Sequence, residues 1–273
     1  MIRVLTVYVV AIVELNTTLE TEAAALASDL GITAYEARLM LAPGVPVVVR
    51  TTADKPEALD LLARLRSRGH GAVACDASAV VASHDMASMR RFRMGPDGIS
   101  LEDVPGAKLP FDDVIALEAA VHRRRVASES EVRDKKLSVA RTVLSGGLMT
   151  TRTVTREAHT ATEEREPVLY IFARSGTPWI LREHGTSWAG MGRPVAPSSS
   201  ENFRMALGLL RECMPRAPYD DRLVARRFTP ERMALSGTST GTTVTTSSEA
   251  GTDLLAHLLA LWISRAAPTP ERL

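Results

Sequence analysis

Apolar runs and helical periodicities alternate along residues 1–76, and each predicts one element. Residues 5–13 form a continuous apolar run rich in β-branched side chains, which indicates a buried strand. The next apolar positions recur at the spacing of one helix face: Leu19, Ala23, Leu26 and Leu30. Two more strands are expected at 45–49 and 72–75, each preceded by a helical segment. The pattern therefore predicts the order β-α-α-β-α-β.

Capping residues support these helix boundaries. Thr17 with Glu20, and Thr33 with Glu36, have the spacing of a capping box, in which the hydroxyl and the carboxylate each satisfy a free backbone amide. Asp54 is placed to cap the third helix in the same region. Each predicted helix thus begins at a residue whose side chain explains why it begins there.

The sequence pattern of residues 88–228 is typical of an antiparallel sheet. Short apolar segments flank two turn sequences, Gly95-Pro96-Asp97-Gly98 and Ser175-Gly176-Thr177-Pro178, and both predict hairpins. One amphipathic helix follows, beginning at Ser198 and lined on one face by Phe203, Leu207, Leu210 and Met214. Residues 77–87 between the two regions are predicted to be a connector.

The C-terminal part is predicted to be a linker followed by a helix. Residues 229–251 contain a stretch from Ser236 to Ser248 that is almost wholly Ser, Thr and Gly, which is typical of a flexible linker. An apolar helix should follow over 252–273, with one stripe formed by Leu254, Leu258, Leu261 and Trp262. We expect this helix to fold back onto its own chain. Docking of these four side chains on a protein partner and adsorption to a membrane surface are the alternatives.

Composition narrows the class of protein. At 273 residues, with 45% hydrophobic and 24% charged residues, the chain has the composition of about two globular domains. A net charge of +1 and only 4% aromatic residues argue against nucleic acid as a partner. The longest apolar runs are too short to cross a membrane, and Cys75 and Cys213 are isolated. These observations favour a cytoplasmic protein.

Five segments of the N-terminal region carry a resemblance to a known family. They are Leu30 to Arg38, Ala42-Pro43, Val47 to Val49, Lys55 to Ala58, and Gly69 to Val73. Together they resemble the C-terminal domain of the bacterial ribosomal stalk protein. The resemblance covers about a quarter of the chain and implies a small α/β sandwich over residues 1–76.

The resemblance also implies a contact surface, and there this sequence departs from the family. The family's first two helices carry basic residues that contact translation factors. Here the first helix holds Glu20, Glu22 and Asp29 without a Lys or Arg, and Arg38 is the basic position that matches in the second helix. We therefore expect the fold to serve a different contact.

The order of elements in residues 88–228 looks like that of a pleckstrin-homology-like domain. This resemblance implies an antiparallel β-barrel whose open end is closed by the C-terminal helix. A different α+β fold with a curved sheet is the alternative. The predicted fold class is α+β, a stalk-like domain followed by this barrel.

The sequence contains no recognisable constellation of catalytic residues. The sequence contains no Gly-x-Ser-x-Gly elbow and no phosphate-binding loop before a Lys-Ser or Lys-Thr pair. The six histidines show no metal-ligand spacing, and the adjacent His84 and Asp85 are interpreted as a solvated pair. We therefore predict a protein that is not an enzyme and that has no cofactor and no metal site.

One cluster of charge remains as a candidate binding site. Basic residues flank the acidic segment 128–131, and in a hairpin the two basic ends would face each other: Arg123, Arg124 and Arg125 on one side, Lys135 and Lys136 on the other. The resemblance to pleckstrin-homology-like barrels implies a phosphorylated ligand at such a mouth, and arginine suits phosphate. The alternative is a solvated hairpin whose charges pair internally.

The sequence favours a cytoplasmic adaptor or scaffold that binds protein partners through two small modules. The first alternative is a peripheral binder of an anionic lipid headgroup or another phosphorylated ligand, located at the inner membrane surface and acting through the basic hairpin. An unrecognised enzyme is the second alternative.

Overall fold

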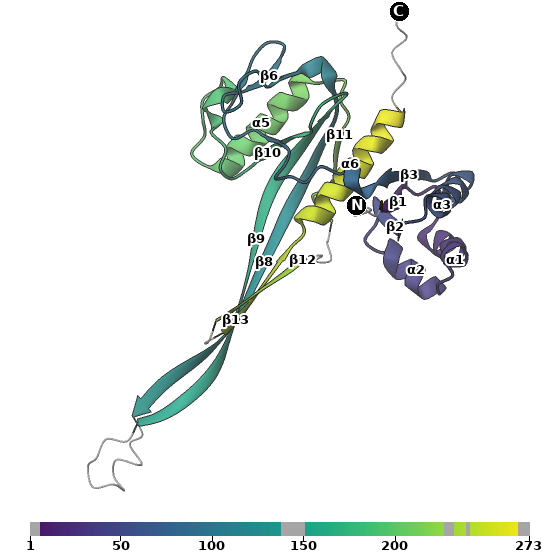
Figure 1. Ribbon diagram of the computed structural model, residues 1–273. Coiled ribbons are helices and arrows are strands. Elements are labelled where there is room, and N and C mark those ends of the chain that lie inside the picture. Colours follow the sequence, from purple (N-terminus) through teal and green to yellow (C-terminus); the bar gives the residue numbers. More distant parts are fainter. Residues whose placement is uncertain (1–5, 138–150, 227–231, 239–240, 267–273) are drawn as a thin grey trace, which may run out of the picture. The chain divides into compact units, whose positions relative to one another are not determined.

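The computed structural model describes residues 6–137, 151–226, 232–238 and 241–266, with side chains over 6–126, 162–226 and 246–265. Contacts divide the chain into two compact units. The first comprises Met1–His122, Glu166–Phe228 and Glu249–Leu273, and the second comprises Arg123–Arg165 and Thr229–Ser248. Figure 1 labels the elements of both units. The mixed α+β class predicted from the sequence is confirmed.

The N-terminal module, residues 8–76, has the predicted order of elements. These are β1 (Tyr8–Glu14), α1 (Leu19–Leu30), α2 (Ala34–Leu41), β2 (Val47–Thr52), α3 (Lys55–Ser67) and β3 (Gly71–Asp76).

Most of the predicted helix boundaries in this module are confirmed by hydrogen bonds. The Thr33 hydroxyl accepts a bond from the Glu36 N–H at 3.2 Å, and the Glu36 carboxylate accepts one from the Thr33 N–H at 2.8 Å, which completes the capping box of α2. Asp54 caps α3 as predicted. The cap of α1 is Thr18, one residue after the predicted Thr17, since the Thr18 hydroxyl accepts from the Thr21 N–H.

The three strands of the module form an antiparallel sheet in the order β2-β1-β3. Both faces of the central strand are buried. Val10 and Ile12 pack in the cluster that contains the helices α1, α2 and α3, whereas Val9, Ala11 and Val13 pack in a second cluster with residues of α6 (Glu249–Ala266). Burial on both faces explains why β1 is a continuous apolar run rather than an alternating one.

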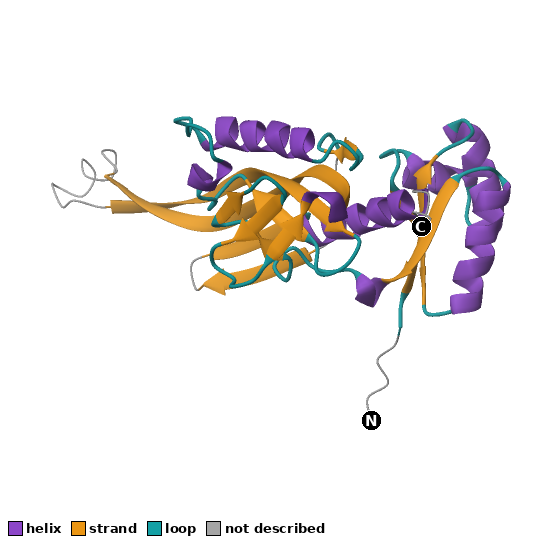
Figure 2. Ribbon diagram, turned by 90° about the horizontal axis from the view of Figure 1, so that it is seen from above, coloured by secondary structure: helices purple, strands orange, loops and turns teal. Residues whose placement is uncertain are grey.

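Helix α6 covers the face of this sheet that the first three helices leave open. Figure 2 shows helices on both sides of the small sheet, and residues of α6 share a buried cluster with β1 and β3. The helix begins at Glu249, three residues before the predicted start at Thr252. The C-terminal helix therefore belongs to the core of the first unit.

The middle region contains short strands, two long strands and one long helix. Its elements are η1 (Ala77–Ala79), β4 (Ala87–Ser88), β5 (Phe92–Met94), β6 (Gly98–Leu101), β7 (Lys108–Pro110), η2 (Phe111–Asp113), β8 (Val114–Leu137), β9 (Thr151–Ala173), β10 (Trp179–Arg182), η3 (Trp188–Met191), α5 (Ser199–Cys213) and β11 (Tyr219–Leu223). Both predicted hairpins are confirmed, because β5 pairs antiparallel with β6 and β9 with β10. Ser198 caps α5 as expected.

The strands of the first unit do not form the predicted closed barrel among the residues that the structure describes. Strand β10 pairs with β9 on one side and with the two-residue strand β4 on the other, and β4 is the edge of this sheet. Strand β11 pairs in parallel with β8. Strands β5, β6 and β7 form a separate three-stranded sheet. Helix α5 still covers apolar surface as expected, since Phe203, Ala206 and Leu210 are buried against residues of β8, β9 and β10.

The predicted Ser/Thr/Gly linker is wrong over the described part of 229–251. Residues Arg232–Thr238 form β12 and residues Gly241–Ser247 form β13, and the two strands pair antiparallel in the second unit. Strand β13 also pairs antiparallel with residues 124–130 of β8. Several of its residues are Thr or Val, whose branched side chains favour extended backbone even where the segment is polar.

The predicted hairpin within 122–136 is also wrong, because β8 continues through the acidic segment without a turn. Ser128, Glu129 and Ser130 are paired with residues of β13. Residues 122–136 contain no Gly, Pro or Asn that would favour a tight turn. The acidic segment is therefore part of a strand and not a loop.

Candidate functional site

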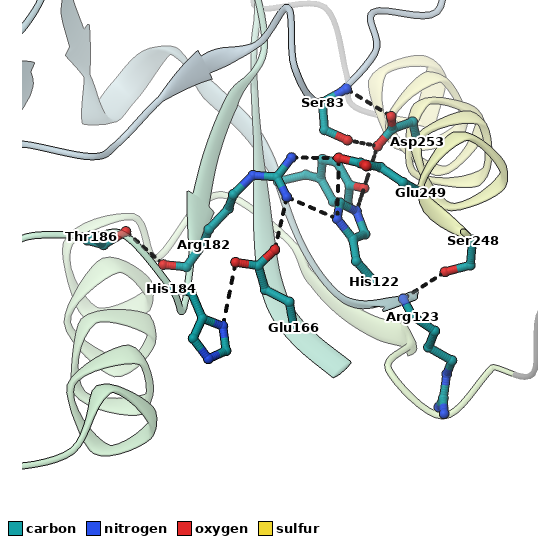
Figure 3. Close-up of polar contacts among 11 residues, drawn as sticks. Ser83, His122, Arg123, Glu166, Arg182, His184, Thr186, Ser248, Glu249 and Asp253 are labelled. Atoms are coloured by element: carbon teal, nitrogen blue, oxygen red, sulfur yellow. Dashed lines mark hydrogen bonds and ion pairs between the residues drawn. The ribbon is translucent and has the colours of Figure 1, made fainter. Parts of the chain in front are cut away.

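A directional chain of hydrogen bonds crosses the core of the first unit (Figure 3). Arg182 Nη1 lies 3.3 Å from His122 Nδ1, and His122 Nε2 lies 2.6 Å from the Tyr170 hydroxyl. The Tyr170 hydroxyl in turn donates to Asp253 Oδ1 at 2.6 Å. Because arginine can only donate, His122 must accept at Nδ1 and donate from Nε2, which makes it the neutral Nε2–H tautomer.

Ser83 donates two further hydrogen bonds to the Asp253 carboxylate. Its hydroxyl donates to Asp253 Oδ1 and its backbone N–H donates to Oδ2 at 2.8 Å. Two residues earlier, the Val81 N–H donates to His257 Nε2 at 3.2 Å. The predicted connector 77–87 is thus tied to α6 by side chains one helical turn apart on that helix.

Charged residues surround the outer end of the chain of bonds. Arg182 donates to Glu166 at 3.0 Å and to Glu249 at 2.7 Å. Burial lowers the pKa of Arg182, but the bonds and negative charges of Glu249 and Glu166 together outweigh this, so the pKa is raised overall. Burial raises the pKa of Glu249, but the bond from Arg182 and the nearby charges of His122 and Arg182 together lower it overall. The three side chains form a partly buried ionic cluster beside His122.

Burial lowers the pKa of His122, and the positive charge of Arg182 lowers it further against the opposing pull of Glu249. Burial raises the pKa of Tyr170 well above its ordinary value, and the nearby Asp253 acts in the same direction. Both pKa shifts favour neutral His122 and a protonated Tyr170 hydroxyl, which are the states that the hydrogen bonds require.

The buried chain of bonds is a structural device rather than a substrate site. His122, Tyr170, Asp253 and Ser83 are at most 7% exposed, and each donor already has its acceptor. A substrate would have to open the core and break these bonds to reach any of the four groups. Their arrangement fixes helix α6 and the connector to the sheet.

The sequence-predicted anion site is not assembled. Arg123 donates to Glu163 at 3.2 Å, whereas Arg124 and Arg125 are exposed. Lys135 and Lys136 lie in the same strand β8, and their side chains are outside the described residues. Ten residues of extended strand separate Arg125 from Lys135, which is about 33 Å at 3.3 Å per residue. The two basic groups therefore cannot converge on one small ligand.

The four residues predicted to bind a partner belong instead to α6 packed on its own chain. Leu258 is fully buried, Leu254 and Trp262 pack against the same cluster, and Leu261 is half-buried. The expectation that the helix folds back on its own chain is confirmed, and Leu258 is out of reach of a partner. Within the described ranges every helix is too short or too polar to span a lipid bilayer.

The acidic residues of α1 are engaged within the N-terminal module. Glu22 is buried and accepts from Arg68 at 2.7 Å and from His70 at 2.6 Å. Asp29 lies 2.8 Å from Arg68 and 3.4 Å from Arg64. The charges that distinguish this helix from the stalk family therefore pair with the end of α3 and hold the two helices together.

Helix α2 exposes an apolar face. Tyr35 is 69% exposed and Leu39 is 54% exposed, one helical turn apart, whereas Ala37 and Leu41 are the buried residues of the helix. Arg38 lies on the exposed side and pairs loosely with Glu20 of α1 at 3.7 Å. We call Tyr35, Arg38 and Leu39 the α2 face.

Comparison of the chain with models of known protein families, with curated proteins and with solved structures found no match.

Proposed function

We propose that the protein is a non-enzymatic adaptor that binds a protein partner through the α2 face. The observation that carries this proposal is the exposure of Tyr35 and Leu39, the two large apolar side chains of that face. Neither residue is needed for the core, because Ala37 and Leu41 bury the opposite side of the helix.

The composition of the face is that of a small protein-binding surface. Aromatic side chains and arginine are enriched among the residues that contribute most to binding energy, and a leucine one turn away adds apolar area. Arg38 is 62% exposed and its ion pair with Glu20 is long, so its guanidinium is available for a partner's carboxylate. The face thus combines two apolar anchors with one positive charge.

The resemblance to the stalk protein supports the same surface. We infer that residues 1–76 have the stalk-like fold, because the order of elements is the one that the resemblance implies. In that family the first two helices carry the contact, and Arg38 stands at the matching basic position of the second helix. We place the adaptor in the cytoplasm, where two isolated cysteines stay reduced.

The decisive experiment compares partner capture by matched variants in cells of the source organism, using short-range chemical crosslinking and quantitative mass spectrometry. The test variant is Tyr35→Ser with Leu39→Ser. The control is Leu59→Ser, which removes a side chain of the same module that is 51% exposed on α3. We expect a partner that crosslinks to the wild type and to the control but is lost from the double variant.

Equal capture by all three proteins overturns the proposal, provided that their thermal unfolding curves coincide. Loss of the same partner from the control alone would move the contact to α3 and also contradict the proposal. Since all three substitutions lie on the surface, stability should change by no more than about 0.5 kcal/mol.

A further inference from the structure

The first unit contains a cleft of about 720 Å³ beside β11. It is enclosed by the end of β1, the start of β8, the segment after α5, β11 and the last turns of α6. Its lining includes Glu14, Val114, Ile115, Tyr219, Trp262 and Ile263. The volume lies within the range of about 300–1,000 Å³ that small-molecule sites occupy.

Aromatic side chains are concentrated at this cleft. One of the five phenylalanines, one of the four tyrosines and one of the three tryptophans of the chain line it, namely Phe111, Tyr219 and Trp262. Trp262 donates its indole N–H to Glu14 at 3.2 Å. A Cβ atom at Gly71 would lie 3.0 Å from the Trp262 ring, so the absence of a side chain there lets the ring pack closely. The Trp262 ring is therefore held in place before any ligand binds.

The cleft is lined by three carboxylates and three arginines, and most of these groups are bonded within the protein. Glu14 accepts a hydrogen bond from Trp262, and Asp220 accepts one from Arg222 at 2.6 Å, whereas Asp112 forms a long ion pair with Arg216 at 3.9 Å. Arg222 also donates to the Val13 carbonyl at 2.8 Å, so its guanidinium is held within the protein on two sides.

Arg174 is the lining cation whose side chain makes no hydrogen bond or ion pair with any described residue. Its backbone N–H donates to the Asp113 carbonyl at 2.9 Å, which anchors the residue beside η2. Its exposed guanidinium offers a fork of donors to a carboxylate, sulfonate or phosphate.

We propose that this cleft binds a small aromatic anion, with its ring system against the aromatic lining and its anionic group at Arg174. Cys213 also lines the cleft, and burial raises the pKa of its thiol. The lining comes from the N-terminal module, the middle region and α6 together. A bound ligand therefore stabilises the first unit as a whole, which goes beyond the adaptor function.

Two fluorescent probes with nearly the same rings distinguish binding of the ring system from binding of the anionic group. 1-Anilinonaphthalene-8-sulfonate carries an anionic group, and N-phenyl-1-naphthylamine is its neutral counterpart. Titrations of the full chain at low salt should give the tighter dissociation constant for the sulfonate. Arg174→Ala should weaken the sulfonate about tenfold, which corresponds to the loss of one hydrogen bond to a charged group. The neutral probe should bind this variant as it binds the wild type.

Two further variants control for binding elsewhere. Arg204→Ala removes an exposed arginine of α5 that does not line the cleft, and it should leave both affinities unchanged. Trp262→Leu removes the Trp262 ring but keeps the helix apolar, and it should weaken both probes. Urea unfolding of every variant shows that the compared proteins are folded under the titration conditions.

The proposal fails if the wild type binds neither probe below millimolar concentration. It also fails if Arg174→Ala leaves the affinity for the sulfonate unchanged, or if Arg204→Ala weakens it as much as Arg174→Ala does. Unchanged binding of both probes by folded Trp262→Leu protein would place them outside the cleft and contradict it as well.

Discussion

The Tyr170 hydroxyl donates a 2.6 Å hydrogen bond to the Asp253 carboxylate and thereby joins the long strand β9 to the C-terminal helix α6. Both side chains are buried, and the same carboxylate also accepts from the hydroxyl and the backbone N–H of Ser83. A buried carboxylate in an apolar helix is stable only where donors surround it. Asp253 therefore fixes three distant segments of the sequence to one another.

Replacement of Asp253 by Ala should lower the free energy of unfolding by about 3 kcal/mol. The substitution leaves the Tyr170 hydroxyl and both donors of Ser83 without an acceptor, and unsatisfied buried donors cost about 1–3 kcal/mol each before relaxation. Tyr170→Phe removes one donor and should cost about 1–2 kcal/mol. Urea denaturation of the two single variants and the double variant measures their coupling.

The matched control for this cycle is Asp85→Ala, which removes an exposed carboxylate of the same connector. Strictly additive effects of Tyr170→Phe and Asp253→Ala would show that the two groups do not interact in solution.

The N-terminal module was predictable because its signals are local. The capping box of Thr33 and Glu36, the cap at Asp54 and the left-handed Gly31 each lie within a few residues of the boundary that they set. Local chemistry of this kind can be recognised without knowledge of the rest of the fold.

The predictions that failed depend on contacts between distant residues. The polar segment of β13 becomes a strand because it pairs with β12 on one side and with β8 on the other. Composition alone suggested a linker, although Thr243, Val244 and Thr245 already favoured extended backbone. Asp253 and His257 also indicate a distant contact in the sequence, because two polar residues one turn apart in an apolar helix indicate buried partners.

Hydrogen exchange should show that β13 is a strand in solution. Because β13 lies between two strands, each of its central N–H groups faces a neighbouring backbone. Amides of residues 242–246 should therefore exchange far more slowly than those of a Ser/Thr/Gly linker. Val244→Pro removes one donor from the middle of the ladder and should abolish this protection. Exchange of wild-type residues 242–246 at the rate of an unstructured peptide would contradict the strand.

His122 should make the protein less stable as the pH falls. Burial lowers the pKa of His122 in the folded chain below its ordinary value of 6.5, so the unfolded chain binds the proton more readily. The stability from neutral His122 is fully present above about pH 6.5 and is lost as the pH falls through the folded-state pKa. His122→Asn should therefore flatten the decline in the free energy of unfolding on the acidic side of pH 6.5.

The control for this titration is His84→Asn, because His84 is exposed on the connector. His257 has a pKa lowered by burial as well, so part of the acid dependence should remain in the His122 variant. An unaltered slope in His122→Asn protein would show that this histidine does not stay neutral in the folded chain.

Glu118 should have the opposite effect on the pH dependence of stability. The side chain is fully buried in β8, and neither carboxylate oxygen has a hydrogen-bond partner among the described residues. Burial raises the pKa of Glu118 well above its ordinary value of 4.5, and Asp220 raises it further while Arg222 opposes the shift. The favourable contribution of protonated Glu118 is fully present below about pH 4.5 and is lost as the pH rises through the folded-state pKa.

Glu118→Met should raise the free energy of unfolding by about 1–3 kcal/mol at neutral pH, because it replaces two unsatisfied buried oxygens with an apolar group of similar volume. The gain should grow from pH 5 towards alkaline pH, where the wild type must bury the charge. Urea denaturation across this range, with the exposed Glu212→Gln as control, measures it. If Glu118→Met instead lowers the stability by an amount that does not vary with pH, the prediction is contradicted. That result would mean that the Glu118 carboxyl is hydrogen-bonded in solution, because such a carboxyl is costly to remove and its contribution does not depend on pH.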